Sequence, residues 1–387
     1  MPTPFVATSR TRETNWPALV FVAGYHVALL VTLPIYLTLR SPSWELIALA
    51  AFLLVSSLIA VTAGYHRLYA HVTYRTKKAV EAVYLFFATL ATQGSALEWA
   101  HDHRLHHKHV DTEGDPYGTQ HGFWQSHLLW MFTKRKAFDE RFVRDLRQNK
   151  LLVFQDKYYA WLMAAANILA VVGIAAITGD VVGAFVIGFL LRLFVAHHCT
   201  WFINSLAHMW GSKPYSHEHS AVNNFILALL TYGEGYHNYH HTFAGDYRNG
   251  VRWYQFDPPK YLIWMLSKVG LASDLKRVDA LMIKKKLLQA DRNLLIDHLE
   301  QVYDARKASL LESVEKTAHR LSETIGSIKA LRDRYGALER KKDRAEAQHL
   351  KMRFRELKAQ MREDLRTWKS LCRTVIKLEV APQRATQ

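Results

Sequence analysis

The most informative pattern in the chain is the gathering of apolar residues into a few long stretches. Residues 17–39 and 44–64 form one pair, and residues 155–203 form a longer apolar region that is interrupted near Gly179. A helix rises about 1.5 Å per residue, so about 20 apolar residues cross the hydrocarbon core of a bilayer. The pattern therefore predicts four membrane-spanning helices, at about residues 17–39, 44–64, 155–178 and 181–203.

Two shorter apolar segments complicate the count of membrane crossings. Residues 79–97 include Glu81 and Gln93, and residues 221–233 are a short run. We expect both to be helices that lie at the membrane interface and lead into the polar segments that follow. Arg192 conflicts with a lipid-facing fourth span, because a charge in the middle of the bilayer is costly unless it faces other helices or water. We retain the two-helix hairpin.

The distribution of lysine and arginine predicts the orientation. The expected outer turns contain only Arg40, whereas basic residues are abundant at the opposite ends of the spans. Because cytoplasmic loops are enriched in Lys and Arg, we expect both termini to be cytoplasmic, in a bacterial inner membrane or the endoplasmic reticulum. The basic residues in question are Arg10, Arg12, Arg67, Arg75, Lys77, Lys78 and Lys108.

The character of the chain changes after Pro258 and Pro259. Residues 260–271 form a short apolar patch that we expect at the interface, and from about residue 285 the sequence is strongly charged, with apolar residues spaced by three and four. This pattern predicts a long helix or coiled coil. Self-association, partner docking and a helical hairpin on the cytosolic domain all remain open. The predicted organisation is an N-terminal cytosolic segment at 1–16, a membrane domain at 17–285 and a C-terminal helical region at 286–387.

Composition narrows the choice of partners. Half of the 387 residues are hydrophobic, and the formal net charge is +16 with a sequence pI near 9.7. The basic residues accompany membrane spans and a charged tail, so we expect no nucleic acid binding; anionic lipid, a phosphate-bearing substrate and an acidic electron carrier are better targets. Two cysteines, Cys199 and Cys372, provide neither a disulfide framework nor a thiolate metal site.

Histidine carries most of the chemical information. In a helix, positions i, i+3 and i+4 share one face, so each of two His-x-x-His-His groups is expected to present three imidazoles to one point. His66 and His71 are five apart and diverge around an α-helix, so we expect them at a helix end. Neutral imidazole is a common ligand of transition metals, and the grouping predicts one polynuclear metal site. The nine histidines are His66, His71, His103, His106, His107, His208, His237, His240 and His241.

These histidines stand in motifs that resemble those of the integral-membrane acyl-CoA delta-9 desaturases, the stearoyl-CoA desaturase type. The motifs are HRLYAH at 66–71, EWAHDHRLHHK at 98–108, NSLAH at 204–208 and GEGYHNYHH at 233–241, and the resemblance covers roughly residues 15–285. It implies that the nine histidines bind two irons and that Asn204 contacts one iron through water. The predicted fold is all-α: four transmembrane helices, a cytosolic helical di-iron domain and the C-terminal helix or coiled coil.

The resemblance also implies substrate contacts. Gln93, Trp99 and Thr200 match positions that shape the bend of the acyl tunnel, and Asp102, Lys134 and Arg135 match positions that contact the coenzyme A head group. His101 and Gly94 depart from the animal pattern, so an acyl-lipid or acyl-carrier substrate stays open. Leu54 and Leu58, one turn apart, are candidates for the tunnel end, with core packing as the alternative. For Lys134 and Arg135 the alternative is a solvated charge pair.

The implied reaction is the introduction of a cis double bond, at delta-9, into a saturated fatty acyl-CoA. It uses dioxygen and two electrons at the di-iron centre, without a separate acid or base. The chain contains no His-Pro-Gly-Gly motif of a fused b-type cytochrome and no glycine fingerprint for a nucleotide, so we expect an external electron donor, a ferredoxin or b-type cytochrome with its reductase.

Three other interpretations remain to be weighed. A membrane di-iron hydroxylase or alkane monooxygenase has similar histidine boxes and differs in its product. A metal transporter would place histidines inside the spans, where the sequence offers only His26, His197 and His198. A ferritin-like site would use the Glu-x-x-His pairs that begin at Glu98 and Glu234, but it leaves most of the nine histidines unused.

Overall fold

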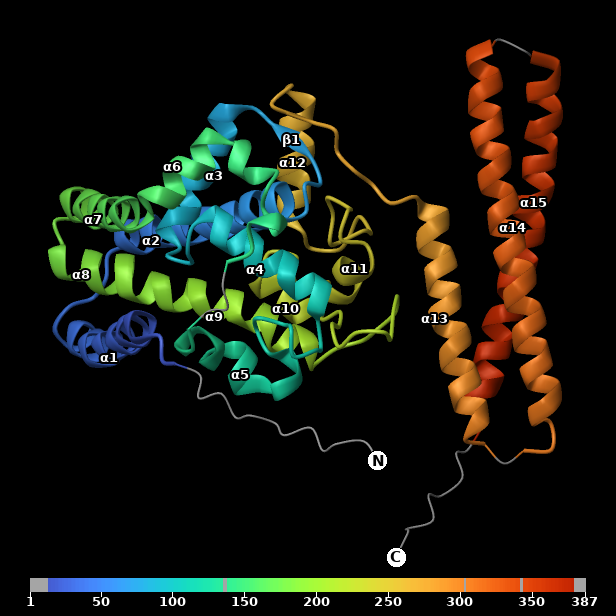
Figure 1. The fold of residues 1–387 in the computed structure, drawn as a ribbon, viewed down its shortest axis with the longest axis horizontal. Coiled ribbons are helices and arrows are strands. Elements are labelled where there is room, and N and C mark those ends of the chain that lie inside the picture. Colours follow the sequence, from blue (N-terminus) through green and yellow to red (C-terminus); the bar gives the residue numbers. More distant parts are fainter. Residues whose placement is uncertain (1–12, 135–137, 303, 342–343, 379–387) are drawn as a thin grey trace, which may run out of the picture. The chain divides into compact units, whose positions relative to one another are not determined.

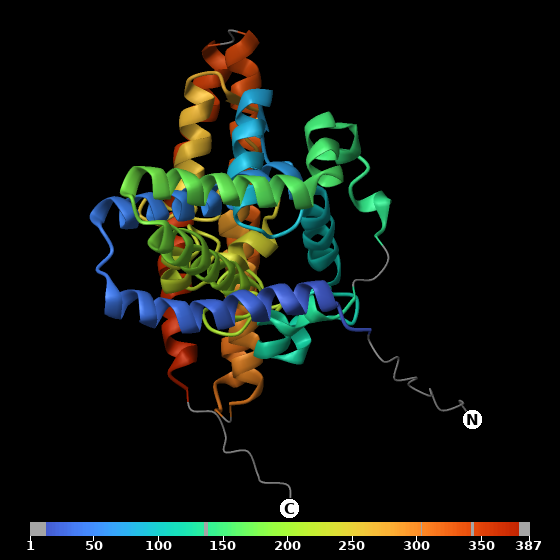
Figure 2. The same ribbon diagram turned by 90° about the vertical axis from the view of Figure 1, so that its left-hand side faces the viewer.

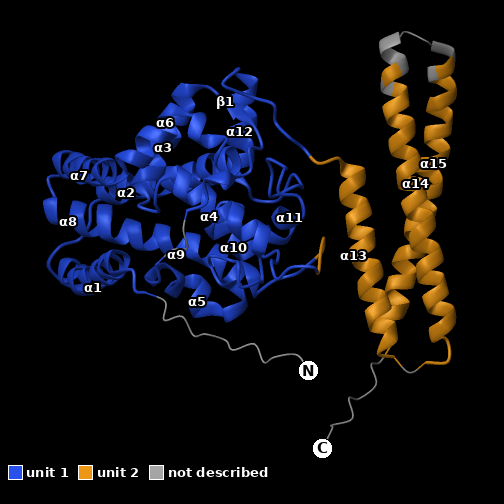
Figure 3. Cartoon of the chain, in the orientation of Figure 1, with its two compact units in different colours: residues 1–213, 218–277 blue, residues 214–217, 278–387 orange. Residues whose placement is uncertain are grey.

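The computed structural model describes residues 13–134, 138–302, 304–341 and 344–378. It divides the chain into two compact units, coloured separately in Figure 3: unit 1 contains residues 1–213 and 218–277, and unit 2 contains residues 214–217 and 278–387. The functional motifs all lie in unit 1. Unit 1 therefore contains the candidate metal ligands.

Unit 1 contains four helices long and apolar enough to cross a membrane, as predicted. The first is α1 (Trp16–Leu39), and the second joins α2 (Trp44–Ala60) to the π-helix η1 (Val61–Ala70). The third is α7 (Tyr159–Thr178), and the fourth runs as one rod through α8 (Val181–Phe185), the π-helix η6 (Val186–Leu191) and α9 (Arg192–Asn204) (Figures 1 and 2). Ser43 and Asp180 begin the second and fourth helices by accepting hydrogen bonds from backbone N–H groups three residues later.

The bounds of the spans differ from the predicted ones in three places. The second helix continues through η1 to Ala70, and the fourth continues to His208. The third begins at Tyr159 because residues Lys150–Lys157 form a separate helix, α6. Both extensions carry histidines of the motifs. The membrane helices themselves thus carry two of the candidate metal ligands, His66 and His208.

Arg192 lies inside the fourth span without facing lipid. Its side chain is buried, and its guanidinium donates hydrogen bonds to the carbonyl oxygens of Gly188 (2.8 Å) and Leu90 (2.9 Å) and to the side-chain oxygen of Asn167. These partners satisfy the polar atoms that a lipid-facing arginine would leave unpaired. The charge is therefore compatible with a membrane span, as the hairpin interpretation requires.

The remaining elements of unit 1 are short. The segment expected as one interfacial helix at 79–97 is divided by a turn at residues 91–95. In the second segment expected as an interfacial helix, residues 221–233, only Phe225–Leu230 is helical. The other elements are α3 (Lys78–Leu90), α4 (Ala96–His109), η2 (Thr119–His121), α5 (Phe123–His127), η3 (Leu129–Phe132), η4 (Glu140–Phe142), η5 (Leu146–Gln148), η7 (Leu206–His208), α10 (Phe225–Leu230), α11 (His237–Thr242), α12 (Pro258–Lys268) and the antiparallel pair β1 (Arg75–Thr76) and β2 (Ala272–Ser273).

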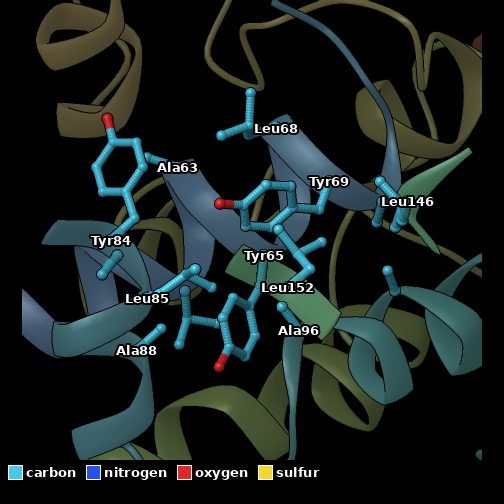
Figure 4. Packing of buried hydrophobic residues seen from close by; sticks show 14 of the residues in the cluster. Ala63, Tyr65, Leu68, Tyr69, Tyr84, Leu85, Ala88, Ala96, Leu146 and Leu152 are labelled. Carbon is cyan, nitrogen blue, oxygen red and sulfur yellow. The ribbon is translucent and has the colours of Figure 1, made fainter. Parts of the chain in front are cut away.

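The main core of unit 1 lies where η1, α3 and α4 meet. Tyr65 and Tyr69 of η1 pack with Leu85 and Leu152, and Ala88 and Ala96 allow the helices to approach closely (Figure 4). The hydroxyl of Tyr65 accepts a hydrogen bond from the buried Gln155. Close packing around η1 fixes the backbone from which the first histidine group projects.

Unit 2 consists of three helices with a core of their own. These are α13 (Ala280–Glu300), α14 (Lys307–Lys341) and α15 (Arg344–Ile376), and α14 and α15 form a long hairpin. Leu295, Leu321, Ile325 and Trp368 are among the buried residues that the three helices share. The predicted long helix thus folds back on itself; a coiled coil and self-association stay predictions.

Candidate metal centre and substrate cavity

The first histidine pair is set by a change of helix type. In η1 the backbone hydrogen bonds run from i to i+5, and the N–H of His71 donates to the carbonyl of His66 at 3.0 Å. A π-helix has more residues per turn than an α-helix, so positions five apart come nearer to the same face. The expectation that His66 and His71 lie at a helix end is met, because His71 caps η1. The wider turn brings both imidazoles into one cluster.

The two His-x-x-His-His groups do not each converge on one point, contrary to the expectation from their spacing. On α4, His103 and His107 join one cluster, while His106 joins another. On α11, His237 and His241 join the second cluster, while His240 joins the first. The reason is that residues i and i+4 stack along a helix face, whereas i+3 is displaced around it. Each helix therefore contributes to both clusters.

The result is a pair of histidine clusters. The ligand atoms within each cluster lie within 4.8 Å of one another. We call them cluster one and cluster two. Cluster one contains His66, His71, His103, His107 and His240, and cluster two contains His106, His208, His237 and His241.

The imidazoles meet through their Nε2 atoms. In cluster one, Nε2 of His240 lies 3.0 Å from that of His66 and 2.9 Å from that of His107. In cluster two, Nε2 of His237 lies 3.2 Å from that of His208 and 3.1 Å from that of His241. A neutral imidazole has one donor and one acceptor nitrogen, so several Nε2 atoms facing one point cannot satisfy one another. A cation at that point resolves the conflict.

Burial favours the neutral form of five of these rings, through a lowered pKa. It lowers the pKa of His103, His107 and His240 well below the usual range for histidine, and the neighbouring imidazoles lower it further. The same causes, burial first, depress the pKa of His237 and His241. A neutral imidazole is the form that binds a metal. Both clusters are therefore ready to accept a metal near neutral pH.

A second layer of polar groups orients the rings by their Nδ1 atoms. His106 Nδ1 lies 2.9 Å from Oδ1 of Asp115, and His208 Nδ1 lies 2.7 Å from the hydroxyl of Ser220, which itself donates to Asp111. Asp115 also accepts hydrogen bonds from the backbone N–H of Tyr117 (3.0 Å) and from Thr119. Partners of this kind turn Nε2 toward the metal position and fix the tautomer.

Glu234 does not act as a bridging carboxylate in the manner of ferritin-like sites. Its Oε2 lies 2.9 Å from Nδ1 of His66, and its Oε1 accepts from the buried Arg67 at 3.1 Å. Arg67 also pairs with Asp257 at 2.9 Å. Burial alone would raise the pKa of Glu234, but the His66 and Arg67 side chains lower it to about 2. The carboxylate supports a histidine from outside the cluster.

Five of the predicted substrate and metal-contact residues line one cavity of about 190 Å³. They are Gln93, Trp99, Asp102, Thr200 and Asn204. The side-chain amide of Gln93 donates to Thr200 at 2.9 Å, which joins the turn after α3 to α9. We call this space the substrate cavity. Four of the six substrate contacts expected from the sequence thus lie together.

A smaller cavity of about 30 Å³ lies between that site and the histidines and shares lining residues with it. Trp99, Thr200 and Asn204 line both spaces, and His66, His103 and His237 line the smaller one. Leu58 also lines it, whereas Leu54 is half-buried on the same helix. We call this space the inner cavity. The two cavities are therefore neighbours, and the inner cavity borders residues of both clusters.

Of the predicted head-group residues, Asp102 lines the substrate cavity, whereas Lys134 is not among the residues that line either cavity. The ammonium group of Lys134 pairs with Glu13, and both side chains are largely exposed. Lys134 is therefore a solvated charge in an ion pair with Glu13. Arg135 lies outside the described residues. A contact between Lys134 or Arg135 and coenzyme A remains a prediction.

The comparisons with known proteins agree with this geometry. The family model described as "Fatty acid desaturase" matches residues 42–263, a range that contains all nine histidines. The chain is 34% identical over 297 residues to "Acyl-CoA desaturase 1" of Saccharomyces cerevisiae, and 32% identical over 279 residues to "sn-1 stearoyl-lipid 9-desaturase" of Anabaena variabilis. These matches cover 75% and 71% of the chain. The chain belongs to the fatty acid desaturase family.

The overlap with the relatives differs in extent. The match spans 57% of the length of the Saccharomyces cerevisiae protein and 61% of "Probable acyl-CoA desaturase" of Schizosaccharomyces pombe, which is 35% identical. It spans 98% of the Anabaena variabilis protein. Together with the four apolar helices, family membership identifies the chain as an integral membrane protein.

Sequence reasoning missed the supporting residues Asp115 and Ser220, and it also missed Arg104. From its place between His103 and His106, its guanidinium donates to the carbonyl oxygens of Ala70 (2.7 Å) and Tyr69 (2.6 Å) and pairs with Asp145 at 2.7 Å. The end of η1 is thereby tied to α4. A basic residue inside a histidine motif was the available signal, but only the fold identifies its partners.

Proposed function

We propose that this desaturase introduces a cis double bond into a saturated fatty acyl chain, at the delta-9 position, and that fatty acyl-CoA is its substrate. Dioxygen and two electrons from an external ferredoxin or b-type cytochrome system complete the reaction. The observation that carries the proposal is the pair of histidine clusters beside the cavity that Trp99, Thr200 and Gln93 line.

The donor set of both clusters fits iron. Imidazole nitrogen suits iron among the transition metals. A metal–imidazole bond is about 2.0–2.1 Å long, so ligand atoms on opposite sides of one ion lie roughly 4 Å apart. The ligand atoms of each cluster lie within 4.8 Å of one another, which supports one ion per cluster. We assign cluster one to one iron, and cluster two, with Asn204 acting through water, to the other.

The irons would supply the oxidising power that removal of hydrogen from an unactivated methylene requires, drawn from reduction of dioxygen. The residues of the chain position the imidazoles and the substrate. Asp115, Ser220 and Glu234 hold the imidazoles in place. Trp99 and Thr200 line the path by which one pair of carbons would approach. The buried, apolar surroundings keep water from the reacting carbons.

Names of the relatives support the substrate class without deciding it. The two yeast proteins are named acyl-CoA desaturases, and the Anabaena variabilis protein is named a stearoyl-lipid desaturase. We favour acyl-CoA because the sequence motifs resemble that class. Both termini and the two clusters are assigned to the cytoplasmic side, where a soluble electron donor can reach them.

Product analysis tests this function. The purified protein in lipid nanodiscs would be supplied with stearoyl-CoA, an electron-transfer system and dioxygen, and the extracted chains would be analysed by gas chromatography and mass spectrometry. We expect a cis olefin at carbon 9. Hydroxylated chains without a new olefin would favour the hydroxylase interpretation, and an olefin formed only from glycerolipid would reject acyl-CoA as the substrate.

A further inference from the structure

A third cavity lies among the membrane-spanning helices, beside the substrate cavity. It has a volume of about 330 Å³ and is lined by residues of α1, α7, α8 and η6 together with Thr92. Ile168 and Val172 on its wall are exposed by 62% and 57%. Because these residues belong to a membrane span, the medium that they face is lipid. We call this space the bilayer-side cavity.

The lining of the bilayer-side cavity favours an apolar occupant. Its polar side chains are those of Thr92 and Asn167. The amide nitrogen of Asn167 donates to the carbonyl of Met163 at 3.0 Å, and its oxygen accepts from Arg192. Both polar atoms of that amide therefore already have a protein partner. A hydrocarbon chain therefore suits the space better than a polar ligand.

Two residues line both this cavity and the substrate cavity. They are Phe21 of α1 and Thr92 in the turn between α3 and α4. Phe21 is 37% exposed, so its ring is free of close packing on one side. Thr92 has a φ of 58°, an unusual backbone conformation for a β-branched residue. Strained residues of this kind persist only where their surroundings hold them.

The surroundings of Thr92 do hold it. Arg192 donates to the carbonyl of Leu90 at 2.9 Å, and the Nε2 of His197 lies 2.8 Å from the carbonyl oxygen of Ala91. After Thr92, the backbone N–H of Gly94 donates to the Tyr159 hydroxyl at 3.0 Å. The buried charge in the fourth span thus has a role in bracing this turn. Thr92 forms a fixed side of the boundary between the cavities, and the partly exposed Phe21 forms the other side.

We propose that an acyl chain of a bilayer phospholipid occupies the bilayer-side cavity and reaches the substrate cavity between Phe21 and Thr92. The inference rests on the proposed function only for the identity of the substrate cavity; it concerns occupancy by a bilayer lipid and leaves fatty acyl-CoA as the proposed substrate. The test of the inference needs no turnover, because occupancy of the two cavities by a lipid chain can be measured without reaction.

Photolabelling tests the route. The full chain would be placed in nanodiscs of phosphatidylcholine that carries a diazirine on one acyl chain, irradiated without electron donor, and mapped by peptide mass spectrometry. We expect label at Ile168 and Val172, and at Met131, which lines the substrate cavity. Label at Ile168 and Val172 without label at Met131, in both wild type and Phe21→Ala, would overturn the route.

A matched pair of variants shows whether the cavity itself is responsible. Ala164 lines the bilayer-side cavity, whereas its neighbour Ala165 is exposed on the same helix. Ala164→Trp should fill the cavity and lower label at Met131 several-fold, while Ala165→Trp should leave it unchanged. Phe21→Ala should raise it. Equal labelling of Met131 in the two tryptophan variants would contradict the proposal. Failure to form an olefin, by contrast, would bear on the proposed function alone.

Discussion

At the scale of single residues, the spacing of the histidines in the sequence does not predict which of them belong to cluster one and which to cluster two. The motifs identify nine histidines, and each of the nine belongs either to cluster one or to cluster two. The pairing could not be read from the sequence, because residues i+3 and i+4 of one helix share a face but differ in direction by about 100°. Placement of His106 and His240 in opposite clusters depends on where α4 and α11 lie in the fold.

Removal of one ligand should therefore affect one iron first. We expect His240→Ala, in cluster one, and His106→Ala, in cluster two, to abolish desaturation, each with lower iron content and a largely retained fold. The measurements are product yield, iron per chain, and helical content by circular dichroism. His121→Ala is the control, because this imidazole is partly exposed and lies outside both clusters. Full activity in either ligand variant would reject the assignment of that histidine.

The support of His106 by Asp115 gives a finer prediction. Asp115→Ala removes the partner of His106 Nδ1, and loss of such partners costs about 10–100-fold in metal affinity. Asp115→Asn keeps an oxygen acceptor and should recover part of the loss. Iron retention during dialysis against a chelator measures the effect. Equal retention in wild type and Asp115→Ala would show that the contact does not position the ring.

At the scale of elements, apolar periodicity predicted the four spans but not their internal changes of helix type. A window of apolar residues indicates that a helix crosses the membrane, yet it carries no signal for backbone bonds from i to i+5. The apolar pattern therefore does not predict the π-helix η1, although η1 determines how the imidazoles of His66 and His71 come together. The turn at Thr92 was missed for a similar reason, because tertiary contacts hold it.

Arg104 should be sensitive to the shape of its head group and not only to its charge. Its guanidinium binds the carbonyls of Tyr69 and Ala70 together, and an ammonium group cannot reproduce that fork. We expect Arg104→Lys to lower the thermal midpoint and the iron content together. Arg141→Lys is the control, since Arg141 is exposed and pairs with Asp139. A variant Arg104→Lys with unchanged iron content would show that the end of η1 is held by other contacts.

At the scale of the whole molecule, the two units have separate cores. The buried cluster around η1 contains residues from 60 to 272, and the cluster of the C-terminal helices contains residues from 288 to 375. The sequence predicted a change of character near residue 285, because charge density rises there. It could not predict that the helical tail forms its own three-helix core, since its spacing of three and four is also that of an intermolecular coiled coil.

A cavity in the second core should leave the metal centre intact. Leu321 is wholly buried among α13–α15, so Leu321→Ala should cost about 2–5 kcal/mol of stability. In this variant we expect a protease to cleave within residues 278–387 at a lower temperature than in the wild type, with iron content and product yield retained. Parallel loss of iron would show that the stability of unit 1 depends on unit 2.

The iron content of the active protein tests the central claim most directly. Plasma mass spectrometry of purified desaturase that forms an olefin should give two irons per chain, because each cluster of imidazoles holds one ion. One iron per chain, or zinc in place of iron in a preparation that still forms the olefin, would contradict the account.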